Sequence, residues 1–264
     1  MKAIILAAGQ GSRLKPLTNN LPKCMVDLFG KPLIKRQIEV FHSCGIKDIS
    51  VITGYKKEKI VLEDVYFFHN SEFNSTNMVE TLFCAREKLF DEVIISYGDI
   101  IFQKNILHEL ISSPYDISVV VDKSWKKYWQ KRFSNILDDA ESMEIDNDGF
   151  IQSIGQKTEN LDDICGQYIG LMKFSKNSIN SVIEFYDNVK KISIETGVNP
   201  LNGKLPFEKS YMTDFLQGLI DDGNKIKAIN INNNWLELDT MDDFSLYNKL
   251  YKNKEIFEFY NPNA

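Results

Sequence analysis

The chain has 264 residues, of which 43% are hydrophobic and 26% are charged, and its formal net charge is −6. A chain of this length can bury one large core, so we expect a single domain over residues 1–264, and the mild negative charge argues against general nucleic-acid binding. No run of eighteen apolar residues occurs and no charged-then-apolar leader opens the chain, so we expect a cytoplasmic protein without a membrane partner. The four cysteines lack paired spacing, which favours free thiols.

An apolar run at residues 3–8 predicts a buried strand that opens onto a glycine-rich loop. Gly9 and Gly11 let the backbone approach an anion, and Arg13 and Lys23 supply the positive charge that a polyphosphate needs. A dinucleotide-binding turn would require a third glycine where a leucine stands, and no Gly-Lys-Ser/Thr of a Walker-type loop is present. An ordinary glycine turn stays open, although two basic residues and two prolines in one loop weigh against it.

Short apolar runs then alternate with amphipathic segments, which predicts a parallel sheet. These segments are residues 3–7, 32–44, 49–53, 77–89, 93–97 and 117–121. Pro32 is suited to be the first residue of a helix that stops before Gly45. In open sheets of this kind ligands bind beyond the carboxyl ends of the strands, where Gly9, Gly54 and Asp99 fall.

After residue 121 the pattern becomes mixed. Asp148 and Gly149 predict a hairpin turn between strands near 143–145 and 150–154. Further on, helices are expected at 208–219 and 241–251 and a strand at 226–231.

Two stretches in this half invite a binding interpretation. Residues 123–132 mix basic and aromatic side chains, and Trp125 and Trp129 would share one helix face. A lid over an anionic substrate, or an oligomer contact, is favoured there over nucleic-acid binding. The acidic cluster at residues 138–148 lacks the spacing of a calcium loop and is interpreted as a solvated hairpin.

Residues 6–18 read Leu-Ala-Ala-Gly-x-Gly-x-Arg-Leu-x-Pro-Leu-Thr and are followed by Pro22-Lys23. This pattern resembles the signature of the nucleoside-diphosphate-sugar pyrophosphorylases, a family of nucleotidyltransferases. The resemblance continues at residues 30–34, 52–55, 97–99 and 236–240, and it therefore spans nearly the whole chain. It implies an α/β fold, a Rossmann-like three-layer sandwich with a mostly parallel central sheet and a mixed α+β second half. Residues 1–122 would bind the nucleotide and residues 123–264 the acceptor.

The resemblance also implies the site residues. Arg13 should hold the triphosphate, Lys23 should bridge the α-phosphate and the incoming oxygen, and Asp99 and Asp239 should hold Mg²⁺, which prefers carboxylates, phosphate oxygens and water. The nucleotide would be bound by Leu6, Ala7, Ala8, Gly9, Gly11, Ser12, Arg13, Lys23, Gly54, Asn77 and Gly98. Without the resemblance, a turn residue for Asp99 and a helix N-terminal cap for Asp239 stay open as the less favoured alternatives.

The implied reaction is attack by a phosphate or phosphonate oxygen on the α-phosphorus of a nucleoside triphosphate, with release of pyrophosphate. It needs no general base, because a phosphomonoester is largely dianionic at neutral pH. Many sugar-handling relatives carry Glu-Lys where this chain has Gln156-Lys157. The chain therefore most resembles the compact cytidylyltransferases, which join CTP to small non-sugar acceptors such as phosphocholine, phosphoglutamine or aminoethylphosphonate for cell-surface modification.

An acceptor pocket is expected from residues of the second half, namely Lys157, Tyr168, Tyr211, Asp214 and Trp235. Tyr168 and Trp235 could instead be core aromatic residues. Two further alternatives stay open: a uridylyl- or thymidylyltransferase acting on a sugar 1-phosphate, and a non-catalytic nucleotide-sensing relative. The presence of all four catalytic residues favours an enzyme. The sequence permits a homodimer without requiring one.

Overall fold

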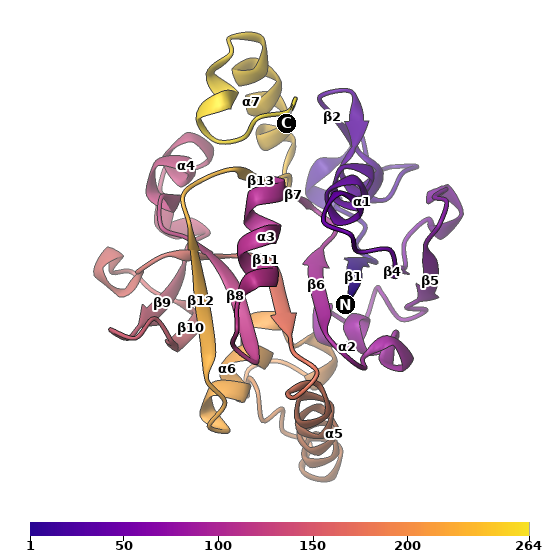
Figure 1. The fold of residues 1–264 in the computed structure, drawn as a ribbon, viewed down its shortest axis with the longest axis vertical. Helices are drawn as coiled ribbons and strands as arrows, with labels where there is room; N and C mark the ends of the chain where they lie inside the picture. The colour runs from indigo at the N-terminus through magenta and orange to yellow at the C-terminus, as the bar shows by residue number, and fades with distance from the viewer. Residues whose placement is uncertain (264) are drawn as a thin grey trace.

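The structure, a computed structural model, describes residues 1–263 and has a seven-stranded sheet at its centre (Figure 1). In spatial order the strands are β12 (Ile226–Ile231), β8 (Ile117–Asp122), β11 (Gln167–Phe174), β6 (Val93–Tyr97), β1 (Lys2–Ala7), β4 (Ile49–Thr53) and β5 (Tyr66–His69). Strand β11 runs antiparallel to both of its neighbours, and the remaining pairs in the sheet are parallel. The prediction of a mostly parallel central sheet is therefore confirmed.

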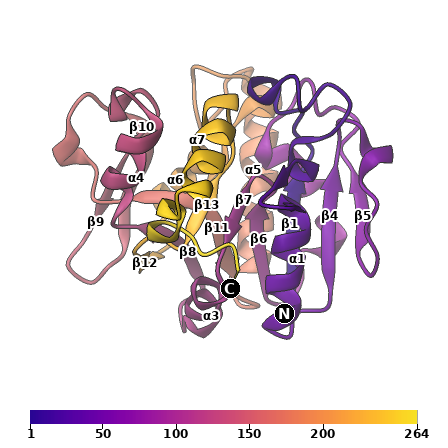
Figure 2. The same cartoon turned by 90° about the horizontal axis from the view of Figure 1, so that it is seen from above.

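Helices cover both faces of this sheet, as Figures 1 and 2 show. One face carries α1 (Leu33–Ser43) and α3 (Lys104–Ser112), and the other carries α2 (Met78–Phe83), α5 (Ile179–Thr196) and α6 (Met212–Asp221). Strand β1 serves both layers, because successive side chains of a strand point to opposite faces. Ile5 packs in the core on the α1 side, and Ile4 and Leu6 pack in the core on the α2 side. The predicted three-layer sandwich is confirmed.

Short pairings outside the main sheet decide which loops meet. Strand β7 (Ile100–Phe102) pairs with β13 (Trp235–Glu237), and β2 (Asp27–Leu28) pairs with β3 (Lys31–Pro32). Since β7 follows Asp99 directly and β13 ends two residues before Asp239, the first of these ladders brings two carboxylates from opposite ends of the sequence together.

The expected hairpin is present as β9 (Glu141–Ile145) and β10 (Ile151–Lys157), and it packs against α6. Helix α7 (Met241–Lys252) is present as predicted for 241–251, and a short 3₁₀ helix at Glu255–Glu258 follows it. Three helix boundaries differ from the prediction. Pro32 precedes α1 as its cap, α2 ends at Phe83 and is followed by a separate 3₁₀ turn, and α6 begins only at Met212.

Helix α4 (Trp125–Arg132) corrects the interpretation of the basic and aromatic stretch. Trp125 and Trp129 are 1% and 4% exposed, and their rings meet edge to face at 6.0 Å. Both indoles therefore belong to the core rather than to a lid or an oligomer contact.

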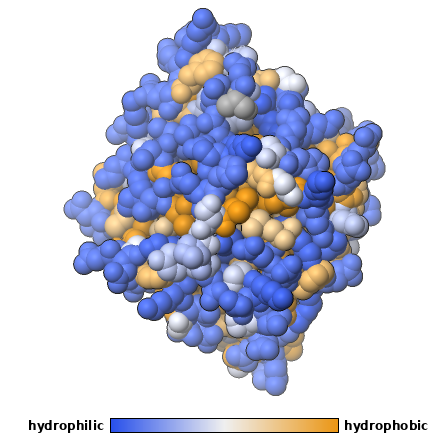
Figure 3. Space-filling view, in the orientation of Figure 1, coloured by the Kyte–Doolittle hydropathy of each residue, from blue (hydrophilic) through white to orange (hydrophobic). Residues whose placement is uncertain are grey.

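On the face seen in Figure 3 the surface is mainly hydrophilic, with apolar side chains gathered in a band across the middle. No helix within residues 1–263 is long and apolar enough to cross a membrane.

Candidate active site

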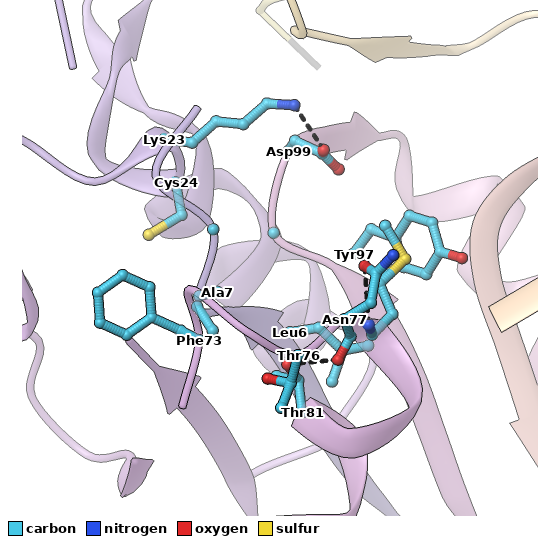
Figure 4. Close-up of a pocket in the computed structure, with 14 residues that line it drawn as sticks. Leu6, Ala7, Lys23, Cys24, Phe73, Thr76, Asn77, Thr81, Tyr97 and Asp99 are labelled. Atoms are coloured by element: carbon cyan, nitrogen blue, oxygen red, sulfur yellow. Dashed lines mark hydrogen bonds and ion pairs between the residues drawn. The ribbon is translucent and has the colours of Figure 1, made fainter. Parts of the chain in front are cut away.

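A first cavity of about 180 Å³ opens at the carboxyl ends of β1 and β6 (Figure 4). A cavity needs about 10–15 Å³ to hold one water molecule, so this cavity has room for a ligand much larger than water. Its walls are Leu6, Ala7, Ala8, Gly9, Lys23, Cys24, Phe73, Thr76, Asn77, Met78, Thr81, Tyr97, Gly98 and Asp99. Most of the predicted nucleotide-binding residues are thus brought around one space.

Close backbone packing forms this cavity. A Cβ atom on Gly98 would lie 2.7 Å from the carbonyl oxygen of Leu6, and one on Gly54 would lie 2.6 Å from that of Ala8. Neither distance is tolerable, so the loop after β6 can approach the end of β1, and the loop after β4 the residue that follows β1, only with glycine at these positions. Gly54 does not line the cavity, but it packs directly against Ala8 and Phe73, which do.

Lys23 joins the two predicted metal carboxylates, and Figure 4 shows its ammonium group next to Asp99. Its Nζ donates to Asp99 Oδ2 at 2.7 Å and to Asp239 Oδ1 at 2.6 Å. Burial would lower the pKa of Lys23, but the two carboxylates outweigh that effect and raise its pKa above the ordinary value. Arg13 pairs with the other oxygen of Asp239 while its side chain stays 65% exposed. The four predicted catalytic residues therefore form one cluster.

Buried side chains fix the backbone that carries this cluster. Gln37, 1% exposed, donates to the carbonyl oxygens of Tyr97 and Ile100 at 2.8 and 2.7 Å, which sets the loop that holds Asp99.

On the opposite side of the cluster, Asp243 accepts from the backbone N–H of Asp239 at 3.1 Å and pairs with the Arg132 guanidinium at 2.9 Å. Arg132 is 1% exposed in its side chain, so this support is internal to the fold.

The two aspartates suit a divalent cation. Within residues 1–263, Asp99 Oδ1 is buried and has no hydrogen-bond partner, so one hard oxygen is left unsatisfied beside the cluster. The same part of the chain has no group of three or more His, Cys, Asp and Glu residues that could hold a metal. Magnesium commonly uses one or two protein carboxylates and completes its shell with phosphate oxygens and water, which matches this donor set.

A second cavity, of about 170 Å³, adjoins the first through the shared wall residues Met78 and Tyr97. Its other walls are Trp129, Asp139, Glu141, Gln167, Tyr168, Ile169, Gly170, Tyr211, Thr213, Trp235 and Glu237. Lys23 and Asp99 line the first cavity, and Glu237 of the second cavity is one of the charges that raise the pKa of Lys23, so the cluster lies close to where the two spaces meet.

Three of the five predicted acceptor residues lie in this second wall, namely Tyr168, Tyr211 and Trp235. The other two do not line either cavity. Asp214 accepts from the backbone N–H of Tyr211 at 2.8 Å and so caps helix α6. Lys157 lies beside the wall, directly opposite Glu141 in the β9–β10 hairpin.

The acidic cluster at residues 138–148 is only partly a solvated hairpin. Asp146 and Asp148 surround the turn, but Asp139 and Glu141 line the second cavity. Burial, together with Asp139 and Asp214, raises the pKa of Glu141 to about 7. The interpretation as a wholly solvated segment is therefore wrong for these two residues.

Sequence reasoning missed several wall residues, and some of them carried a usable signal. Glu237 and Asp239 alternate along one extended segment, which places both on one side of the chain. By contrast, Phe73, Thr76 and Thr81 reach the first cavity from a loop and the short helix α2, where no pattern marked them.

Residues 3–148 match the family model described as the MobA-like NTP transferase domain. The chain belongs to this nucleotidyltransferase family. It is 42% identical over 257 residues to the CTP:phosphoglutamine cytidylyltransferase of Campylobacter jejuni, covering 93% of this chain and 98% of the relative. It is 39% identical over 119 residues to the choline-phosphate cytidylyltransferase of Streptococcus pneumoniae, covering 44% of this chain and 52% of that relative.

Solved structures agree on the fold. The CTP:phosphocholine cytidylyltransferase from Streptococcus pneumoniae superposes with a TM-score of 0.70 at 22% identity, covering 96% of this chain and 98% of the other. The inositol-1-phosphate CTP transferase from T. maritima gives 0.69 at 18% identity, covering 95% and 96%. The predicted nucleotide-diphospho-sugar transferase fold and the predicted resemblance are both confirmed.

Proposed function

We propose that this nucleotidyltransferase joins CTP to a small non-sugar phosphate and releases pyrophosphate, with Mg²⁺ as the metal. The observation that carries the proposal is the cluster of Lys23, Asp99 and Asp239 close to where two cavities meet, one for each substrate. The extensive similarity to a CTP:phosphoglutamine cytidylyltransferase supports the choice of CTP and of a non-sugar acceptor.

The chemistry balances without a protein base. An oxygen of the acceptor phosphate forms a bond to the α-phosphorus of CTP, and the bond from that phosphorus to the bridging oxygen of the β-phosphate breaks. The acceptor is already largely dianionic at neutral pH, so no proton has to be removed. Catalysis then consists of positioning and of neutralising charge. The products are a CDP-linked compound and pyrophosphate.

Each residue of the cluster has a part in this step. Lys23 places a fixed positive charge between the α-phosphate and the attacking oxygen, and Arg13, exposed at the rim, holds the leaving phosphates. Asp99 and Asp239 would hold the cation, which supplies further neutralisation of the triphosphate. Because Lys23 occupies both carboxylates in the free protein, binding of the metal and nucleotide has to exchange these ion pairs for contacts to phosphate.

The walls of the first cavity suit a nucleoside. The backbone amides of residues 6–9 and the side chains of Asn77 and Thr81 offer polar contacts for a base and ribose beside apolar surface. The division into a nucleotide half at 1–122 and an acceptor half at 123–264 remains a prediction, as do a homodimer and a role in modifying a cell-surface polysaccharide.

The test is pyrophosphate release with Mg²⁺ from CTP, UTP, dTTP, ATP and GTP, each paired with phosphoglutamine, phosphocholine, aminoethylphosphonate and glucose 1-phosphate. The proposal expects release with CTP and a non-sugar acceptor. Release only from UTP or dTTP with glucose 1-phosphate would contradict it. CTP binding without release from any pair would favour a nucleotide-sensing protein instead.

A further inference from the structure

Residues 255–262, the segment that follows helix α7, are packed into the fold. A short 3₁₀ helix opens the segment, and the side chains of Phe259 and Tyr260 after it are buried in the core on the α1 side of the sheet. Phe102 of β7 and Trp235 of β13 belong to the same core. Figure 1 shows the segment, in yellow, above β7 and β13. It therefore lies beside the two strands that bring the catalytic carboxylates together.

The first contact of the segment is with the turn before β13. The backbone N–H of Asn234 donates to the carbonyl oxygen of Phe259 at 2.6 Å. Asn233 and Asn234 both have positive φ, 56° and 67°, which asparagine tolerates better than most residues. Strand β13 begins at the next residue and ends two residues before Asp239. The contact therefore fixes the start of the strand that carries Asp239 to its place.

A second contact reaches the strand that follows Asp99. Gln103 comes directly after β7, and its Nε2 donates to the carbonyl oxygen of Asn261 at 3.2 Å. The backbone N–H of Gln103 donates to the carbonyl oxygen of Asn234 at 3.0 Å. Gln103 thus binds the turn before β13 with its backbone and the 255–262 segment with its side chain.

A third contact reaches the hairpin that follows Lys23. Strand β2 is separated by one residue from the 3₁₀ turn at Lys23–Met25. Arg36 of α1 donates to the carbonyl oxygens of Leu28 and Phe29 in this hairpin at 2.9 and 2.8 Å. The same guanidinium donates to the carbonyl oxygen of Pro262 at 3.2 Å. One buried side chain therefore joins this hairpin to the 255–262 segment.

Resting on the proposed function, we infer that the 255–262 segment aligns the three parts of the chain that form the catalytic cluster, and that Arg36 and Gln103 act through it as positioning residues. In the free protein the ion pairs within the cluster also join these parts. Metal and nucleotide have to exchange those ion pairs, so in the reacting complex the alignment depends on contacts outside the cluster. A displacement of about 1 Å in such a site costs about 10²-fold in rate.

The alignment can be measured without turnover through the amide of Leu238. This N–H donates to the carbonyl oxygen of Asp99 at 3.0 Å, so its hydrogen exchange reports how often the two carboxylate segments separate. Strand β4 lies on the opposite side of β1 from β6 and carries no member of the cluster. Its amides report general unfolding instead.

Gln103→Met removes the donor to Asn261 and keeps the length of the side chain. The Gln103 side chain makes no capping bond to α3, so the helix keeps its own hydrogen bonds. Loss of this one hydrogen bond should make the Leu238 amide exchange about threefold to tenfold faster and leave the β4 amides unchanged. Asn224→Leu is the matched control. Asn224 also donates from a half-buried side chain to a backbone carbonyl, that of Leu219 at 3.0 Å, but it follows α6 and lies outside both cavities, so Leu238 exchange should not change.

Shortening the chain tests the partner of Gln103. A variant that ends at Tyr260 lacks the carbonyl groups of Asn261 and Pro262, which accept from Gln103 and Arg36. It should already show the faster exchange of Leu238. Adding Gln103→Met to it should then accelerate exchange by less than about twofold, because the two changes remove the same bond.

Turnover supplies a readout that a merely structural role would not move. Gln103→Met should lower kcat for pyrophosphate release by about tenfold or more and change KM for CTP by less than about threefold. The positioning role is overturned if Leu238 exchange in this variant stays within about twofold of the parent, if the β4 amides accelerate equally, or if kcat does not change. A parent protein without pyrophosphate release would remove the proposed function. The exchange measurements, made without substrates, would still decide whether the segment aligns the cluster.

Discussion

Replacing Lys23 by methionine tests the catalytic cluster in two independent ways. The change keeps an unbranched side chain of similar but shorter length and removes the charge that joins Asp99 and Asp239, whose side chains are 18% and 12% exposed. One oxygen of each carboxylate lies within 2.7 Å of Lys23 Nζ, so the two oxygens are at most about 5 Å apart. Without the ammonium group, the two negative charges repel by about 3 kcal/mol at an effective dielectric constant of 20.

Two results are expected from Lys23→Met. Turnover should fall by about 10²–10³, the usual loss for one electrostatic contact in the transition state. The free protein should unfold at lower urea concentration than the parent, and added Mg²⁺ should restore more stability to the variant than to the parent, since the cation no longer competes with an ammonium group.

Lys31→Met is the matched control, because Lys31 pairs with Glu39 at 2.6 Å in an exposed pair of 39% and 58% side-chain exposure. Such pairs contribute about 0–1 kcal/mol, so neither turnover nor the Mg²⁺ response should change noticeably. The reasoning is refuted if Lys23→Met retains turnover within about tenfold of the parent and shows the same Mg²⁺ response.

Four further outcomes are expected. Gly9→Ala should weaken CTP binding without loss of stability, because Gly9 lines the first cavity and a Cβ atom there has no protein atom within 4 Å. Gly203→Ala is the control, since that position is equally open but lies outside both cavities, and this variant should bind CTP normally. Equal CTP affinities of the two variants in calorimetry would contradict this prediction. Arg132→Met should lower the free energy of unfolding in urea by about 3–5 kcal/mol, because it leaves Asp243 buried and unpaired; a loss below about 1 kcal/mol would refute the role of this pair. Chelation of divalent cations should abolish pyrophosphate release and Mg²⁺ should restore it, and release that persists with chelator would remove the metal from the mechanism. The pKa of Glu141 is raised from 4.5 to about 7 in the folded state, so the ionised carboxylate lowers the stability of the fold as pH rises. Glu141→Gln should therefore unfold at the same temperature as the parent near pH 4.5 and at a higher temperature above about pH 7. A difference in unfolding temperature that is the same at the two pH values would contradict this.

The sequence predicted best where the signal was local and repeated. Strands β4 and β6 begin and end at the expected residues, because their continuous apolar runs bury both faces and loops interrupt them sharply. The predicted catalytic residues were brought together by a different kind of signal. These residues follow strand ends in a pattern long enough to identify a family, and the β7–β13 ladder then brings Asp99 and Asp239 together.

The walls of the second cavity were predicted only in part, because the residues come from several elements. Trp129 belongs to α4, Glu141 to β9 and Gln167 to β11, and no spacing within any of these elements reveals that the three residues meet around one cavity. Charge alone was also misleading. Asp139 and Glu141 share an acidic stretch with the exposed turn at Asp146, and only the packing of the hairpin separates the buried carboxyls from the solvated ones.

The most direct measurement follows the phosphorus atoms of CTP. CTP labelled at the α-phosphorus, and separately at the γ-phosphorus, is incubated with Mg²⁺ and a small non-sugar phosphate acceptor, and the products are separated. The mechanism predicts the α-label in the CDP-linked product and the γ-label in pyrophosphate alone. A γ-label transferred to the acceptor, or released as free phosphate while CDP accumulates, would contradict attack at the α-phosphorus.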